Sequence, residues 1–106
     1  MIGFSLYPHH LKEGSGCSLA NFAEMVAIAA ERYGVHALGI GSDLCQDQPD
    51  SVVEWMRNGR WSIERDFGEG SADQPGFPAQ PNWFEGIKDF PNISVGLAEV
   101  GFSADE

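Results

Sequence analysis

The sequence predicts an α/β fold, because two short apolar runs flank a segment with the apolar spacing of an amphipathic helix. Met1 to Leu6 is the first run, residues 19–33 carry the helical spacing, and Val35 to Ile40 is the second run. The order strand, helix, strand within about 40 residues is typical of a parallel βαβ unit. We therefore expect two parallel strands joined by a crossover helix.

The first run and the helix have recognisable ends. Tyr7-Pro8 closes the run MIGFSL, which favours a buried strand over a helix, and the glycine-rich stretch 9–16 is expected to be a loop. Ser18 is expected to cap the helix and Gly34 to end it. The apolar face of the helix recurs at three- and four-residue spacing: Leu19, Phe22, Ala23, Val26, Ala27, Ala30 and Tyr33.

Two further helices are expected beyond the second run. Ser51 and Glu54 have the spacing of a capping box and predict a short helix that Gly59 ends. Asn92 is expected to cap a last helix that stops before Gly101.

A long irregular loop is expected between these helices, at about residues 60–91, which are rich in proline and glycine without a sustained period. Loops of that length serve as lids, binding loops or arms between subunits. Large aromatic side chains lie in or near this loop, and either packing or an interface would explain them: Trp55, Trp61, Trp83, Phe84 and Phe90.

Composition restricts the function. The 106 residues suffice for one domain, and six basic against sixteen acidic residues give a formal net charge of -10. A field of that sign does not attract a phosphate backbone, so we expect no nucleic-acid partner. We expect no secretory signal and no membrane span, because no apolar stretch has the required length. The protein is expected to be cytoplasmic, with Cys17 and Cys45 as reduced thiols.

Both ends of the sequence predict continuation. Residues 103–106 have the S-x-x-E form of a capping box, which starts a helix. Two parallel strands also leave sheet edges that further strands normally cover. We therefore interpret residues 1–106 as a single incomplete domain of a larger α/β protein.

Asp43 is the main candidate for a chemical role. It follows the second expected strand in the stretch Gly39-Ile-Gly-Ser-Asp43, and barrel enzymes carry catalytic groups at the carboxyl ends of their parallel strands. The alternative is an aspartate that only forms a turn. We exclude a dinucleotide-binding loop, because its third glycine would fall where the chain has Leu44.

The histidines and cysteines can be explained by structural positions in a loop, at the surface or in the core, as well as by roles in metal binding or catalysis. Adjacent residues in an extended chain point to opposite sides, so His9 and His10 would make a poor metal pair and are expected as loop residues that could line a site. His36, next to a helix end, is expected at the surface. Cys17 and Cys45 are interpreted as small hydrophobic residues rather than nucleophiles.

Three stretches of the chain carry a family pattern: GFSLYPHHLKEGSGCSL, GVHALGIGSDLCQDQPDSVVEWMRNGRW and GLAEVGFSADE. They resemble the C-terminal part of the membrane (renal-type) dipeptidase family of zinc peptidases, particularly its bacterial members. The resemblance implies a fragment of a (β/α)8 TIM-type barrel. In it, Met1–Leu6 and Val35–Ile40 would be two late strands, and Ser18–Tyr33 the crossover helix.

The resemblance also implies an activity. Family members hydrolyse dipeptides with two zinc ions and a metal-bound water. Asp43 matches the family aspartate at the end of the seventh strand, near the substrate amino group and that water, which implies a catalytic role. Tyr7 and His9, at the end of the neighbouring strand, are secondary candidates for substrate binding. The family's zinc ligands come from earlier strands and are not matched here, and Asp43-Leu-Cys-Gln46 replaces the usual Asp-Phe-Asp-Gly.

We therefore expect part of a zinc-dependent dipeptidase that carries one active-site carboxylate, takes dipeptides as substrates, forms a homo-oligomer and is inactive in isolation. One alternative is a non-enzymatic half-barrel module that associates with itself or with a partner through strand edges and the aromatic loop. Another is a metal-binding fragment that uses His9, His10 and either Cys17 or Cys45.

Overall fold

The computed structural model describes residues 1–44, 48–57 and 76–106. These belong to two compact units, one formed by residues 1–44 and 80–106 and the other by residues 45–79. In the described part of the chain, no helix is long and apolar enough to cross a lipid bilayer.

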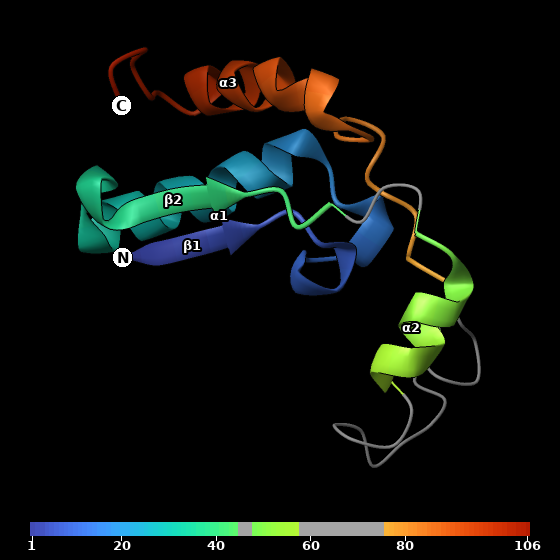
Figure 1. The fold of residues 1–106 in the computed structure, drawn as a ribbon. Helices are drawn as coiled ribbons and strands as arrows, with labels where there is room; N and C mark the ends of the chain where they lie inside the picture. The colour runs from blue at the N-terminus through green and yellow to red at the C-terminus, as the bar shows by residue number, and fades with distance from the viewer. Residues whose placement is uncertain (45–47, 58–75) are drawn as a thin grey trace. The chain divides into compact units, whose positions relative to one another are not determined.

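The first unit holds the sheet and two of the helices (Figure 1). Its elements are β1 (Ile2–Ser5), α1 (Leu19–Tyr33), β2 (Leu38–Gly41) and α3 (Phe90–Glu99), with single 3-10 turns at Pro8–His10, Gly14–Gly16, Val35–Ala37 and Ile87–Asp89. The second unit holds α2 (Asp50–Arg57).

The two strands form a parallel pair. Ile2 lies opposite Leu38 and Ser5 opposite Gly41, and the Leu6 N–H extends the ladder with a 3.0 Å hydrogen bond to the Gly41 carbonyl. They make up the one sheet of the described residues. A mixed α/β fold with a parallel βαβ unit is therefore confirmed, whereas its origin as a fragment of a (β/α)8 barrel stays a prediction.

Helix α1 has the predicted bounds and ends. The hydroxyl of Ser18 accepts a 3.1 Å hydrogen bond from the Asn21 N–H, which satisfies one of the free donors of the first turn. Gly34 ends the helix with a φ of 83°, a conformation that glycine adopts without a steric penalty. The predicted apolar face supplies the buried residues Phe22, Ala23 and Val26.

The predicted starts of β2 and α2 were wrong by a few residues. Val35–Ala37 is a 3-10 turn rather than strand, because the Ala37 N–H closes a turn onto the Gly34 carbonyl at 3.1 Å, so β2 begins only at Leu38. Helix α2 begins at Asp50, which puts Ser51 inside the helix instead of at its cap. The predicted end of that helix, Gly59, lies outside the described residues.

The last helix also starts earlier than predicted. Phe90 opens α3 and Pro91 follows in the first turn, where proline needs no hydrogen-bond partner. Asn92 is therefore not the cap; its side-chain amide donates to the Trp83 carbonyl at 2.9 Å. The capping-box stretch 103–106 forms a turn, in which the Ser103 hydroxyl donates to the Glu106 carboxylate at 3.2 Å.

The core of the first unit lies around α1. Its buried side chains are Leu6, Leu11, Cys17, Phe22, Val26, Trp83, Phe84 and Ile93. The indole N–H of Trp83 donates to the Cys17 carbonyl at 2.7 Å, and the rings of Phe22 and Trp83 lie 5.2 Å apart. Residues 80–84 of the expected long loop are thus tied to α1.

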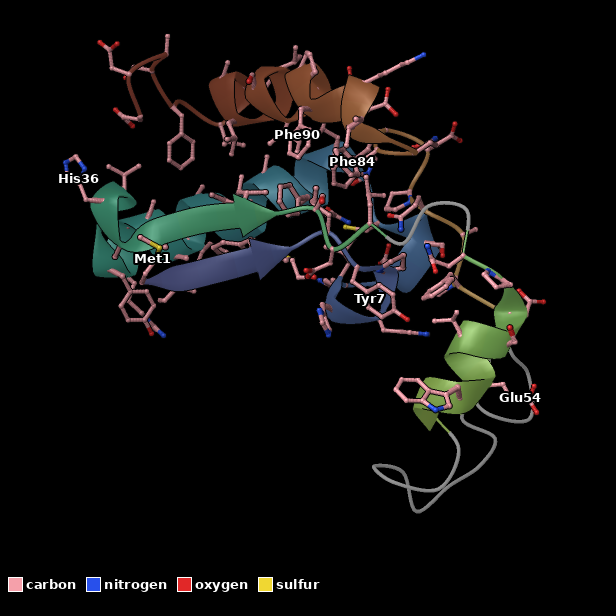
Figure 2. The ribbon with its side chains drawn as sticks, in the orientation of Figure 1. Met1, Tyr7, His36, Glu54, Phe84 and Phe90 are labelled. Carbon is pink, nitrogen blue, oxygen red and sulfur yellow. The ribbon has the colours of Figure 1, made fainter. Side chains whose placement is uncertain are left out.

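The predicted aromatic cluster divides into packed and exposed members. Trp83 and Phe84 are buried, which confirms packing for these two, and Figure 2 shows Phe84 and Phe90 beneath α3 in this view. Phe90 is 41% exposed, and Trp55, in the second unit, is 74% exposed. Trp61, like the first half of the predicted loop, lies outside the described residues.

Candidate site at the carboxyl ends of β1 and β2

The candidate site lies where both strands of the sheet end. Ser5 is the last residue of β1, and Asp43 follows β2 by two residues. Because the strands are parallel and Ser5 pairs with Gly41, both side chains belong to the same edge of the sheet. Figure 2 shows Tyr7 just beyond β1, at the opposite end of the sheet from Met1 and His36.

The hydroxyl of Ser5 is the centre of the site. It donates a hydrogen bond to Oδ2 of Asp43. The backbone N of Tyr7 lies 3.0 Å from Oγ of Ser5, and Nδ1 of His10 lies 2.9 Å from Oγ of Ser5. A carboxylate, a hydroxyl and an imidazole are therefore linked in that order.

The backbone at Asp43 is held in an unusual conformation. Its φ is 48°, in the left-handed region. Among the described non-glycine residues, only Glu13 also has a positive φ. Aspartate tolerates this region better than most residues, because its short polar side chain forms local hydrogen bonds. The hydrogen bond from Ser5 adds a second restraint, so both the backbone and the side chain of Asp43 are oriented.

Tyr7 lies against both neighbouring histidines. Its ring centroid is 5.4 Å from that of His9 and 5.4 Å from that of His10, and both ring pairs are edge-to-face. The expectation of extended chain at His9 and His10 was wrong, because residues 8–10 form a 3-10 turn. In this turn the His10 N–H donates to the Tyr7 carbonyl at 2.9 Å. Tyr7 and His9 thus lie beside the site, as candidates for its wall.

The order of the hydrogen bonds differs from that of a serine nucleophile triad. In a triad the imidazole lies between the carboxylate and the hydroxyl and accepts the hydroxyl proton. Here the hydroxyl of Ser5 lies between Asp43 and His10 and gives its proton to the carboxylate. The arrangement therefore orients the carboxylate rather than activating the serine.

Cys17 belongs to the core and not to this site. Its side chain is 2% exposed. Burial, with a smaller contribution from the negative charge of Glu13, raises the pKa of the Cys17 thiol. A buried thiol with a raised pKa fits the predicted role as a small hydrophobic residue; Cys45 lies outside the described residues.

The described residues do not fit a zinc site. Across residues 1–44, 48–57 and 76–106, no three His, Cys, Asp or Glu side chains come close enough together to hold a metal ion. His36, one further potential ligand, is exposed and lies at the other end of the sheet (Figure 2).

Sequence reasoning named Asp43, Tyr7 and His9, considered His10 only as a loop residue that could line a site, and missed Ser5. Ser5 is the one polar side chain in the apolar run from Met1 to Leu6, and it stands at the end of that run. That position was a signal for a site residue. No signal in the sequence indicated the hydrogen bond between His10 and Ser5, because this bond depends on the 3-10 turn after Tyr7.

Comparison of the chain with family models, with curated proteins and with solved structures found no match.

Proposed function

We propose that residues 1–106 are part of a zinc-dependent dipeptidase of (β/α)8 type, to which they contribute the active-site carboxylate Asp43. The observation that supports this most is the position of Asp43 beyond β2, next to the end of β1, with its carboxylate bonded by the Ser5 hydroxyl. Barrel enzymes bind substrates and carry catalytic groups at this edge.

Two chemical roles suit Asp43 in dipeptide hydrolysis. A carboxylate pairs with the ammonium group of a dipeptide through charge-assisted hydrogen bonds. A carboxylate also accepts a proton from water and returns it to the leaving amine. Asp43 is exposed, so a substrate can reach it.

Zinc enters this proposal through the sequence resemblance alone. The described residues do not form a metal site, so they are not proposed as ligands. Residues 1–106 by themselves are therefore expected to be inactive toward dipeptides, with or without added zinc. Cleavage of a dipeptide by the purified chain with zinc, abolished by Asp43→Asn, would contradict this part of the proposal.

The test of the proposal uses the protein translated from the whole reading frame that contains residues 1–106. Hydrolysis of a panel of dipeptides is measured for the wild type, for Asp43→Asn and for Asp105→Asn as a matched control. Asp105 is an exposed aspartate in the turn after α3. We expect Asp43→Asn to lower kcat/KM by about 10²–10⁴ and Asp105→Asn to leave it unchanged.

N-acetylated dipeptides separate the two roles, because they lack the ammonium group. If Asp43 pairs with the ammonium, the acetylated substrates lose most of their kcat/KM in the wild type and little more in Asp43→Asn. If Asp43 moves a proton, Asp43→Asn lowers kcat for both kinds of substrate. An Asp43→Asn variant that hydrolyses dipeptides as well as the wild type would refute the proposal.

The second candidate function is a non-enzymatic module that associates with itself. An apolar groove of about 530 Å³ favours it, lined by Ile40, Phe90, Pro91, Ile93, Ser94 and Leu97. In the described part of the chain each strand also has one edge without a partner strand. A monodisperse oligomer that melts cooperatively and is dissociated by Ile40→Asp, with no dipeptide hydrolysis by the whole reading frame, would support this module over the peptidase.

A further inference from the structure

The three contacts of the Ser5 hydroxyl determine which atom carries which proton. A serine hydroxyl has one proton to donate and two lone pairs to accept with. Its neighbours are the Asp43 carboxylate, the Tyr7 N–H at 3.0 Å and Nδ1 of His10 at 2.9 Å. Three contacts therefore use the full bonding capacity of this oxygen.

The direction of each hydrogen bond follows from the chemistry of the partners. A carboxylate only accepts, so Ser5 donates its single proton to Asp43. A backbone N–H only donates, so Tyr7 takes one of the two lone pairs. The remaining contact can form only if His10 donates, which requires the proton of the neutral imidazole to be on Nδ1.

We propose that Ser5 holds His10 in the Nδ1–H tautomer, so that Nε2 of this exposed imidazole is a proton acceptor in addition to the Asp43 carboxylate. Ser5 is then a positioning residue for both groups. The ligand class that suits Nε2 as an acceptor is a hydrogen-bond donor such as a protonated amine or a bound water. The tautomer stands on the hydrogen bonds alone, whereas a role for Nε2 in peptide hydrolysis rests on the proposed function.

The geometry argues against the reverse arrangement, in which His10 activates Ser5 as a nucleophile. For that, Nδ1 would have to accept the proton of the hydroxyl. That proton is already donated to Asp43, and both lone pairs of the oxygen accept hydrogen bonds.

The tautomer is measured directly by NMR of the ¹⁵N-labelled chain of 106 residues, at a pH where the imidazole is neutral. The shifts of the two ring nitrogens report which one is protonated. We expect Nδ1–H to predominate for His10 in the wild type and in Ser5→Thr, which keeps the hydroxyl. In Ser5→Ala the ratio is expected to move about fivefold toward Nε2–H, the effect of one hydrogen bond. Ser51→Ala, at an exposed serine of α2, is the matched control and is expected to match the wild type.

Predominant Nε2–H in the folded wild type would overturn the inference. So would a His10 tautomer ratio that is the same in wild type and Ser5→Ala while the two proteins have the same dispersed spectrum elsewhere. Neither result depends on dipeptidase activity, so failure of this inference and failure of the proposed function are distinguishable.

The acceptor role of Nε2 is tested in the whole-reading-frame protein with His10→Asn. The asparagine amide keeps a donor near the Nδ1 position but has no atom at Nε2. We expect kcat to fall by about 10² or more while KM changes little. His36→Asn, at the far end of the sheet, is the matched control and is expected to retain kcat. Full kcat in His10→Asn, with Asp43→Asn inactive, would overturn the role of Nε2 and leave the dipeptidase proposal standing.

Discussion

Ser5 donates its hydroxyl proton to the carboxylate of Asp43, a residue 38 positions later in the chain. The two residues stand at the ends of adjacent parallel strands, and the register of Ser5 with Gly41 brings them together. The contact exists because the chain crosses over through helix α1, so that β2 lies beside β1 and runs in the same direction. The candidate site is thus a direct consequence of the βαβ topology.

The left-handed backbone of Asp43 leads to the first prediction. Asp43→Ala and Asp43→Gly both remove the hydrogen bond with Ser5, but alanine keeps the steric cost of a φ of 48° and glycine does not. We expect Asp43→Gly to be more stable than Asp43→Ala by about 1 kcal/mol, as measured by urea unfolding. Equal stability of the two variants would mean that the backbone at this position is not held in the left-handed region.

The second prediction concerns the contact between α1 and α3. A Cβ atom added at Gly96 would lie 2.7 Å from Cγ and Cδ1 of Leu19, which is far closer than such atoms pack. We expect Gly96→Ala to destabilise the fold by about 1–3 kcal/mol, despite the better helix propensity of alanine.

The control for Gly96→Ala is the same change made together with Leu19→Ala. With the leucine side chain gone, adding the methyl group is expected to be neutral or stabilising, by up to about 1 kcal/mol. If Gly96→Ala costs the same in both backgrounds, the close approach of Gly96 to Leu19 is not the cause.

The third prediction tests the hydrogen bond that ties residues 80–84 to the core. Trp83→Phe keeps an aromatic ring but removes the indole N–H and so leaves the Cys17 carbonyl without its 2.7 Å partner. We expect a loss of about 1–3 kcal/mol in the free energy of unfolding. Trp55→Phe, at an indole that is 74% exposed, is the matched control and is expected to change stability by less than about 0.5 kcal/mol. Similar losses for both variants would contradict a specific role of the Trp83 N–H.

The fourth prediction concerns the thiol of Cys17. Its pKa is raised above the usual value of 9.0, mainly because the thiol is buried and to a smaller extent because of the negative charge of Glu13. In the unfolded chain the thiol ionises at its ordinary pKa, so folding keeps it protonated when the pH rises past that value. The sign is therefore a loss of stability as the pH increases above about 9.

Urea unfolding between about pH 8 and pH 10, on either side of the ordinary thiol pKa, checks this sign. We expect the wild type to lose more stability over that interval than Cys17→Ala, which carries the same tyrosines, lysines and Cys45 but lacks the buried thiol. An identical pH dependence of the two proteins would show that Cys17 is not held in its protonated form by the fold.

The sequence predicted the first half of the chain well because its signals there are local. The Ser18 cap, the apolar face of residues 19–33 and Gly34 act within a few residues of one another, and α1 has the predicted bounds. The same holds for the apolar run that became β1, and for Leu38–Ile40 in the run that became β2. Asp43 could be found because the end of a strand can be read from the sequence.

What the sequence missed depends on contacts between distant residues. Asn92 was expected to cap a helix, but its amide bonds the Trp83 carbonyl, and α3 starts with Phe90 and Pro91. Val35–Ala37 has strand-forming residues, but the turn onto Gly34 makes it a 3-10 segment. His10 became part of the site only through the turn after Tyr7, which brings its ring back to Ser5.

We propose above all that Asp43 is the active-site carboxylate of a dipeptidase. The most direct test is the steady-state hydrolysis of dipeptides by the protein of the whole reading frame, for the wild type and Asp43→Asn, with folding of both checked by circular dichroism. We expect a folded variant whose kcat/KM is lower by about 10²–10⁴. A wild-type protein without dipeptidase activity, or a folded Asp43→Asn variant with full activity, would contradict this proposal.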